Sequence, residues 1–288
     1  MSRRVAGKGR KRMKRNRNSP FPAIYLGLVL LLTYLPLLLV MLYSFNAGRL
    51  SSVWEGFSLS WYRELFRDRS IFEALRNSVV LALASSLAAA VIGTLGAVGM
   101  ARTRYRTNGI IEYLSTLPIM IPEIILGMVF LAFFSLIGLP FGMTSLIIGH
   151  TIFCIPYVFT MVKARLAGMD PSYVEAAKDL GAGELRAFWD ITFPLLRPAI
   201  VSGMLISFAM SMDDVIISMF LTDVNVNTLP IKIYTQLKTG VTPKTNALCA
   251  LMFAFTLVLG LLSLWISQNG KAAIAAGNGD RGEKEQRL

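Results

Sequence analysis

Four long stretches of the sequence contain no charged side chain, and they decide its class. No Asp, Glu, Lys or Arg occurs at positions 18–48, 77–101, 124–162 or 245–270. A helix needs about 20 apolar residues to cross about 30 Å of hydrocarbon, so each stretch is long enough to span a membrane. The pattern predicts an all-α, polytopic membrane protein with six transmembrane helices, at residues 24–44, 78–100, 111–136, 144–164, 199–221 and 246–267.

The segments between these helices differ in character. The first helix is too long for the apolar core of a signal peptide, so we expect it to remain as an anchor. The short turn Gly138–Met143 predicts that the third and fourth helices form a hairpin. An amphipathic stretch, Ile231–Lys238, predicts a short helix outside the membrane. The chain then divides into a basic tail (1–23), a transmembrane domain (24–267) and a C-terminal tail (268–288) for which we expect disorder.

The net charge is strongly positive but unevenly placed. The 288 residues include 29 Lys and Arg and 17 Asp and Glu, a formal charge of +12, and nine of the basic residues fall within the first 17 positions. Only 16% of residues are charged, against the ~25% typical of soluble domains. We therefore expect a tail that lies on anionic lipid, and no nucleic-acid partner. Cys154 and Cys249 lie in apolar runs without metal-ligand spacing, so no metal site is expected.

The distribution of basic residues orients the predicted helices. With the N-terminus in the cytoplasm, 21 of the 29 basic residues fall on the cytoplasmic side and 8 on the outer side. The opposite orientation inverts this ratio, against the rule that cytoplasmic loops are rich in Lys and Arg. We therefore expect both termini in the cytoplasm, and the segments Phe45–Arg76 and Asp223–Lys244 outside.

One of the cytoplasmic segments, residues 166–198, has the pattern of a compact unit. Asp170 is a good N-cap residue, and Gly181 supplies the backbone freedom that ends a helix. A second short helix, Glu184–Ile191, is expected to run until Pro194 stops it. The segment is therefore predicted to form two short helices joined by a turn, held close beneath the membrane.

This segment resembles the EAA loop of binding-protein-dependent ABC importer permeases, which reads Glu-Ala-Ala-x3-Gly-x9-Ile-x-Leu-Pro. The matching positions are Glu175, Ala176, Ala177, Gly181, Ile191 and Pro194. At Phe193 the family usually has leucine, so one apolar contact is larger here. The resemblance implies that the loop contains a coupling helix, which docks in a cleft on an ATPase subunit.

The sequence itself has no Walker A motif, Gly-x4-Gly-Lys-Ser/Thr. We therefore expect that the chain is not an enzyme and carries no cofactor of its own. The resemblance implies two partner ATPase subunits, which bind ATP with Mg²⁺ and supply the energy. It also implies a second permease subunit, in a heterodimer, and a periplasmic or extracellular substrate-binding protein.

Four ionisable side chains stand out inside the predicted spans: Glu123, His150, Asp213 and Asp214. Such groups are costly in a membrane and are candidates for function. Two adjacent aspartates on a helix point about 100° apart, so we expect one to face the substrate pathway and the other to pair with a neighbour such as His150. Acidic groups without Lys or Arg in the same spans suit a cationic cargo. The alternative is that these acids are structural and hydrogen-bonded between helices or to the partner permease.

The wider sequence resembles the spermidine/putrescine ABC permeases from about residue 24 to residue 264. The segments that carry this resemblance are Ser44–Asn46, Trp54–Phe57 with Trp61-Tyr62, His150–Cys154, Glu175–Gly181, Ser211–Asp214, Leu229–Tyr234 and Gly240–Leu248. It implies a type I ABC importer permease (MetI-like) fold in the bacterial inner membrane. It also implies inward transport of polyamines by alternating access, with the rings of Trp54 and Trp61 at the outer mouth. These rings are equally typical of interfacial anchors.

Other classes of function remain open to the sequence. The first is an ABC importer permease for another small cationic or polar solute, and the second is a secondary transporter or a channel. Neither a channel nor a secondary transporter has a use for an EAA loop, so deletion of Glu175–Pro194 separates these classes. An intramembrane aspartic protease is excluded, because Asp213 and Asp214 are adjacent and the string Gly277–Asp280 lies in the polar tail.

Overall fold

The computed structural model describes residues 21–49, 53–103, 108–240, 242–258 and 260–261, and this part of the chain confirms the all-α prediction. An isolated antiparallel bridge joins Asn46 to Phe57, and the described residues form no longer strand. Most of the basic tail, the C-terminal tail and the string Gly277–Asp280 lie outside the described residues.

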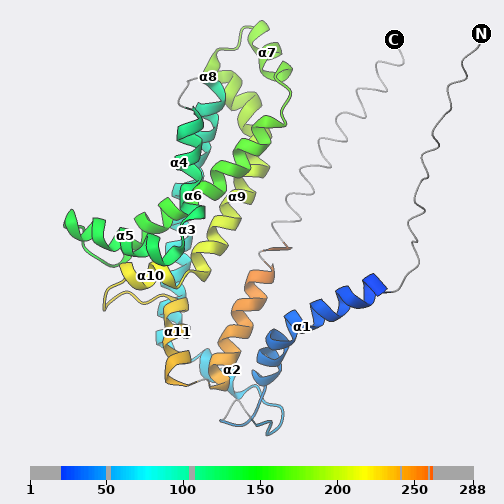
Figure 1. Cartoon of the computed structure of the whole chain (residues 1–288), viewed down its shortest axis with the longest axis vertical. Coiled ribbons are helices and arrows are strands. Elements are labelled where there is room, and N and C mark those ends of the chain that lie inside the picture. Colours follow the sequence, from blue (N-terminus) through cyan, green and yellow to red (C-terminus); the bar gives the residue numbers. More distant parts are fainter. Residues whose placement is uncertain (1–20, 50–52, 104–107, 241, 259, 262–288) are drawn as a thin grey trace, which may run out of the picture.

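The helices follow one another along the chain with short connections (Figure 1). They are α1 (Phe21–Tyr43), α2 (Ser60–Leu65), α3 (Arg69–Arg102), α4 (Asn108–Met120), α5 (Glu123–Leu136), α6 (Met143–Ala167), α7 (Ser172–Asp179), α8 (Glu184–Ala187), the π-helical turn η1 (Phe188–Thr192), α9 (Phe193–Asp213), α10 (Ile216–Leu221) and α11 (Leu229–Thr239). A further apolar helix covers Pro243–Val258.

Helices α3, α6 and α9 pack side by side and form the centre of the molecule. They approach closely because glycines lie where they cross. The amide nitrogen of Phe159 on α6 lies 3.0 Å from where a β-carbon at Gly93 on α3 would be. Around these crossings Leu81, Phe159 and Leu196 are fully buried. Tight van der Waals packing of this kind associates helices in lipid, where the hydrophobic effect between helices is weak.

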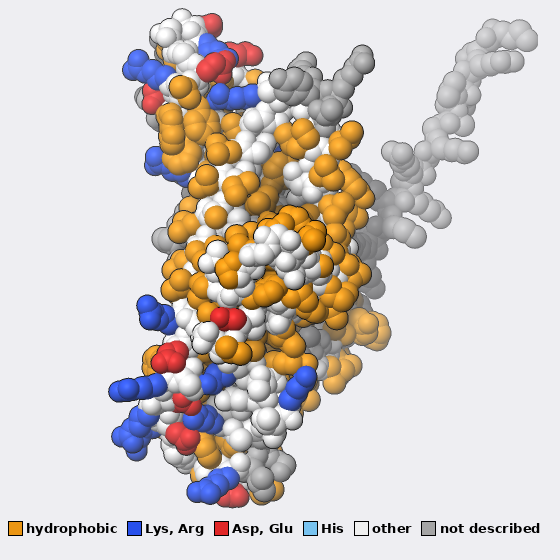
Figure 2. Space-filling view, turned by 90° about the vertical axis from the view of Figure 1, so that its left-hand side faces the viewer, with side chains coloured by type: hydrophobic (Ala, Val, Ile, Leu, Met, Phe, Trp, Pro, Cys, Tyr) orange, Lys and Arg blue, Asp and Glu red, His pale blue; other side chains and the backbone are white. Residues whose placement is uncertain are grey.

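The membrane-spanning character of the chain is visible on its surface. Figure 2 shows a hydrophobic belt over the middle of one face, with most charged side chains gathered toward the two ends. Within the described residues, four helices are long and apolar enough to cross a membrane: α1, α3, α6 and the continuous stretch Glu184–Asp213. The count becomes five when the bent pair α4 and α5 is taken as one span. The sixth predicted span is represented by the shorter helix Pro243–Val258.

The third predicted span, 111–136, is not one straight helix. It consists of α4 and α5, which are bent by 108° at a break after Met120. Pro122 has no amide hydrogen to continue the helix, and proline disfavours helical backbone at the residue before it. As a result α4 packs beside α6 while α5 turns away and packs on α10. Of the two halves of the third predicted span, only α4 therefore packs beside α6, the fourth predicted span, as the predicted hairpin requires.

The fifth predicted span, 199–221, is also broken. Helix α9 ends at Asp213, Asp214 is extended with ψ 122°, and α10 begins at Ile216. At its other end, α9 begins at Phe193, earlier than predicted. The prediction of a single helix was wrong because the Asp214 side chain accepts hydrogen bonds from amides that a continuous helix would pair with backbone carbonyls.

Candidate functional site

The two broken helices bring the acidic side chains together. Glu123 is the first residue of α5, Asp213 the last residue of α9, and Asp214 lies in the break itself. All three line one cavity of about 550 Å³. Its remaining lining side chains come from α5, α9, α10, α11 and the break: Ile124, Met210, Val215, Ile216, Met219, Phe220 and Tyr234. The described residues that line it include no Lys, Arg or His, so the cavity is acidic and otherwise largely apolar.

A second cavity lies on the other side of Asp213. It measures about 410 Å³ and is formed by α11, the break and the helix Pro243–Val258. Asp213 and Tyr234 line both cavities, so they stand at the boundary between them. Sequence reasoning did not single out Tyr234, although its place on the amphipathic stretch 231–238 gave a signal.

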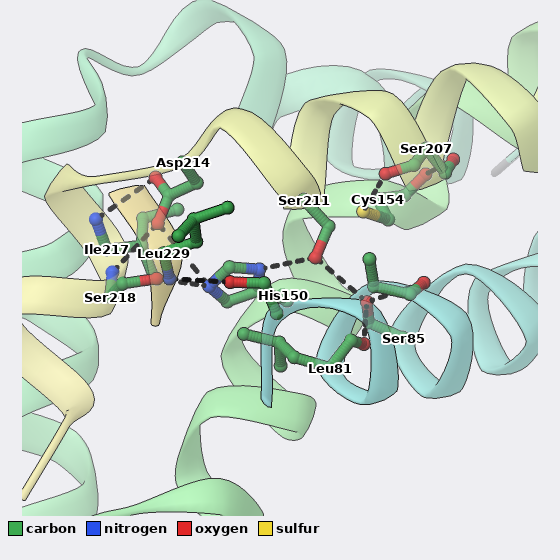
Figure 3. A network of polar contacts seen from close by, with 12 residues as sticks. Leu81, Ser85, His150, Cys154, Ser207, Ser211, Asp214, Ile217, Ser218 and Leu229 are labelled. Carbon is green, nitrogen blue, oxygen red and sulfur yellow. Dashed lines mark hydrogen bonds and ion pairs between the residues drawn. The ribbon is translucent and has the colours of Figure 1, made fainter. Parts of the chain in front are cut away.

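His150 sits in the middle of a buried polar network (Figure 3). Its side chain is fully buried on α6, and its Nδ1 atom lies 2.8 Å from Oγ of Ser211 on α9. Its Nε2 atom lies 3.1 Å from Oγ of Ser218 on α10 and 3.4 Å from a carboxylate oxygen of Asp214. Ser85 extends the network to α3 through a 3.2 Å contact with Ser211. The predicted pairing of one aspartate with His150 is thus confirmed for Asp214.

The two adjacent aspartates have opposite surroundings. Asp214 is 6% exposed, and its oxygens accept backbone hydrogen bonds from Ile217 (3.2 Å) and Ser218 (2.8 Å). These bonds satisfy amides at the start of α10, which have no helical partner. Asp213 is exposed into the cavities. One carboxylate therefore serves the fold, and the other is available to a ligand.

The two tryptophans predicted at the cargo entrance lie at the α2 end and line neither cavity. The indole nitrogen of Trp61 donates to the Gly48 carbonyl at 3.2 Å. Trp54 is 44% exposed and packs edge-on against Tyr43. His150 lines neither cavity either. A part for these three residues in the substrate pathway stays a prediction.

The predicted coupling loop forms a projecting unit at the other end of the molecule (Figure 1). The Asp170 carboxylate accepts a 3.0 Å hydrogen bond from the Ser172 amide at the start of α7, as expected of a capping residue. Gly181 has φ +87°, a left-handed conformation that favours glycine, and it follows the end of α7. The resemblance residues Glu175 and Ala176 are exposed on α7. Ala177 and Ile191 are half-buried, and Gly181 and Pro194 are exposed.

The expectation that Pro194 stops the second helix was wrong. The chain stays helical from Glu184 to Asp213, with a π-helical turn before the proline. In this turn the Phe193 amide bonds the Phe188 carbonyl, five residues back, so the helix widens before it reaches Pro194. Pro194 then occupies the first turn of α9, where a missing amide hydrogen is tolerated.

An ion pair fastens the loop to the body. Arg102, at the end of α3, lies 3.3 Å from the Glu184 carboxylate and also stands over the Phe188 ring at 5.4 Å. Lys178 on α7 pairs with the same carboxylate. Sequence patterns do not predict this arrangement, because its partners come from three separate elements.

The comparisons with known proteins agree with this architecture. A model of the family described as "Binding-protein-dependent transport system inner membrane component" matches residues 89–269. The spermidine/putrescine transport system permease protein PotC of Haemophilus influenzae is 38% identical over 235 residues, which cover 82% of this chain and 91% of that protein. The putrescine transport system permease protein PotI of Escherichia coli is 36% identical over 255 residues, or 86% and 91% of the two chains.

Solved structures support the same fold. A bacterial ABC transporter involved in the import of the acidic polysaccharide alginate matches with a TM-score of 0.65 at 16% identity, over 86% of this chain and 94% of that chain. The MetNI methionine ABC transporter, in inward-facing form, matches with a TM-score of 0.54 at 19% identity, over 76% and 99%. The chain therefore belongs to the binding-protein-dependent transport system inner membrane component family, and it is a multi-pass membrane permease of the ABC importer class.

Proposed function

We propose that this chain carries polyamines such as spermidine and putrescine inward across the bacterial plasma membrane, as one permease subunit of an ATP-driven importer. The observation that carries the proposal is the cavity that Glu123, Asp213 and Asp214 line without any Lys or Arg. Carboxylates are expensive inside a membrane unless a positive charge accompanies them. A cationic cargo supplies that charge as it passes.

The walls of the cavity fit the rest of a polyamine. These molecules alternate ammonium groups with methylene chains, so they need both carboxylates and apolar contacts. Met210, Met219 and Phe220 supply apolar surface beside the acidic positions. Tyr234 adds an aromatic ring to the wall, and the Lys238 ammonium stands over this ring at 4.6 Å. The permeases PotC and PotI, whose names refer to spermidine and putrescine, support this cargo class.

The coupling loop is proposed as the docking site of one of the two ATPase subunits. Large apolar side chains project outward from it, with Leu180 90% exposed and Leu185 75% exposed. Trp189 is exposed beside them. Exposed apolar groups of this size at a charged end of the molecule are typical of a protein interface. The end that carries α7 then faces the cytoplasm, and both chain termini lie on that side, in agreement with the distribution of basic residues.

The remaining partners follow from the transport cycle. A second permease subunit completes the pathway in a heterodimer, and a periplasmic or extracellular binding protein delivers cargo at the α2 end. ATP-driven closure of the ATPase pair displaces the coupling loop, and Arg102 passes this movement to α3 through its contact with Glu184. The spans then tilt, and the cargo moves past Asp213 and Glu123 before it is released inward.

Uptake by the complete assembly tests the proposal. The assembly is reconstituted in liposomes with ATP inside and the binding protein outside, and labelled spermidine and putrescine are offered with competing polyamines. We expect ATP-dependent uptake that Asp213→Asn lowers by at least about tenfold, since loss of a charge partner in a desolvated site costs about 2 kcal/mol or more. Unchanged uptake and unchanged ATPase stimulation by cargo would show that Asp213 does not handle the cargo.

Deletion of Glu175–Pro194 distinguishes the importer from a secondary transporter. Under the proposal the shortened chain no longer retains the ATPase subunits and loses uptake. A secondary transporter keeps its uptake without this loop.

A further inference from the structure

The ring of His150 contacts both halves of the broken α9–α10 span (Figure 3). Nδ1 reaches Ser211, two residues before the end of α9, and Nε2 reaches Ser218 on α10. Between them, the same Nε2 atom lies 3.4 Å from Asp214 in the break. A single side chain on α6 therefore holds the two pieces of another span at a fixed angle.

The Asp214 carboxylate determines which nitrogen of the His150 ring donates a hydrogen bond to it. An ionised carboxylate is an acceptor only, whereas serine hydroxyls can donate or accept. Nε2 therefore carries the hydrogen that faces Asp214, and Nδ1 shares a hydrogen bond with the Ser211 hydroxyl. Both ring nitrogens and the carboxylate then have partners inside the protein, in a place where His150 is 0% and Asp214 6% exposed.

This arrangement settles which aspartate is offered to a ligand. Asp214 is committed to His150 and to the amides of Ile217 and Ser218. Asp213, the last residue of α9, is exposed and lines both cavities. A change in the angle of the break would move Asp213 relative to Glu123.

We propose that His150 is a positioning residue, which fastens α10 to α9 through Asp214 and thereby fixes Asp213 as the carboxylate that meets the cargo. The proposal rests on the transport function proposed above, because it assigns a role within the same cavity. It assigns His150 no contact with the cargo.

Substitutions of graded length provide the first test. In His150→Gln the amide nitrogen reaches the position of Nε2 and can still donate to Asp214, whereas in His150→Asn it reaches only the position of Nδ1. His150→Leu keeps a similar volume and makes neither contact. We expect the Gln variant to keep uptake within about threefold of the unaltered assembly, and the Asn and Leu variants to lose about tenfold, the effect of one buried hydrogen bond to a charged group. A role in packing alone gives another order, with Leu and Gln alike, and would overturn the proposal.

Combination with Asp213→Asn provides the second test. If His150 acts through Asp213, then His150→Leu lowers uptake strongly in the unaltered chain but adds little once Asp213 is Asn. An equal fractional loss in both backgrounds would contradict the proposal. Uptake is compared only for variants that assemble with their partners in unaltered amounts. If His150→Leu does not assemble, Ser218→Ala and Ser211→Ala each remove one contact of the ring and take its place.

Thiol labelling tests the fastening without reference to any cargo. Ser218 is fully buried against His150, and cysteine is close to it in size. In a background with Cys154 and Cys249 replaced by alanine, we expect Ser218→Cys to resist a water-soluble maleimide and to become at least about tenfold more reactive when His150→Leu is added. Continued protection would overturn the proposal. If the unaltered assembly imports no polyamine, the proposed cargo fails, whereas the labelling result still decides the role of His150.

Discussion

Gly203 on α9 faces the backbone of α6 so closely that a β-carbon at position 203 would lie 2.9 Å from the Cα atom of Val158. Backbone atoms cannot rotate aside as the end of a side chain can. The contact lies within the three-helix centre formed by α3, α6 and α9. The spacing between α6 and α9 therefore depends on the absence of a side chain at this position.

We predict that Gly203→Ala is less stable than Gly99→Ala by about 1–3 kcal/mol, the usual cost of overpacking a tight core. Thermal unfolding of the purified protein in detergent measures the effect. Gly99→Ala on α3 is the matched control, because nothing lies within 4 Å of its added methyl group. Both substitutions gain helix propensity of about 1 kcal/mol, so their difference isolates the packing cost. Equal stability of the two variants would refute this account of the crossing.

For polyamine uptake, we expect the charge of the Glu123 side chain to matter more than the length of that side chain. Glu123→Gln removes a carboxylate from the acidic cavity, and Glu123→Asp retains it on a chain one methylene shorter. We predict that the Gln variant lowers polyamine uptake by about tenfold or more and the Asp variant by less than about threefold, since the loss of a charge partner costs about 2 kcal/mol or more. Initial uptake rates in liposomes measure both. Equal rates for the two variants would mean that the charge of Glu123 plays no part.

The exposed leucines of the coupling loop are predicted to hold the ATPase subunits. Leu185→Ser removes a side chain that is 75% exposed in the isolated subunit and buried in the proposed complex. We expect the complex to weaken by about tenfold or more, because burial of a leucine contributes about 1.5–3 kcal/mol. Co-purification of the ATPase with tagged permease measures this. Val224→Ser, at a fully exposed site outside the coupling loop, should leave co-purification unchanged.

An ion pair near the other end is predicted to make stability depend on pH. Lys244 lies 2.9 Å from the Asp68 carboxylate, and this hydrogen-bonded ion pair, with help from Ser70, holds the pKa of Asp68 well below its usual range. A lowered folded-state pKa means that the contribution is complete above the unfolded pKa of about 4 and is lost as the pH falls below it.

The expected size of this contribution is about 1–2 kcal/mol, because the side chains are partly exposed. We predict that lowering the pH from 7 to 3 reduces the free energy of unfolding more in the unaltered protein than in the Asp68→Asn variant. This variant keeps the cap on α3 but has no charge to lose. Identical pH profiles would show that the pair contributes nothing.

The sequence predicted the polar partners better than the shape of the spans. Helix geometry predicted that one of two adjacent aspartates pairs with a neighbour such as His150, and the structure shows that this one is Asp214. The positions of the two helix breaks were harder to predict from the sequence. Pro118, Pro156 and Pro198 lie inside continuous helices, so a proline by itself does not identify a break. Neighbouring helices decide which prolines are accommodated.

The break at Asp214 involves no proline and has no local signal. It depends on His150, which is distant in sequence, and on amides of α10 that become available only when the helix ends. The coupling loop was predicted more fully, because capping by Asp170 and the conformation of Gly181 are local effects. The error at Pro194 arose because a π-helical turn can precede a proline and preserve the helix.

The two breaks also have a consequence for hydration. Wherever a helix stops inside a membrane, peptide amides and carbonyls lose their helical partners, and each unsatisfied group costs several kcal/mol in hydrocarbon. Asp214 satisfies two amides of α10, and the residues at the two breaks, Glu123, Asp213 and Asp214, line the acidic cavity. Water therefore has to reach the middle of the membrane along these breaks. A cargo that enters displaces water rather than lipid, and it keeps part of its hydration until Asp213 and Glu123 replace it.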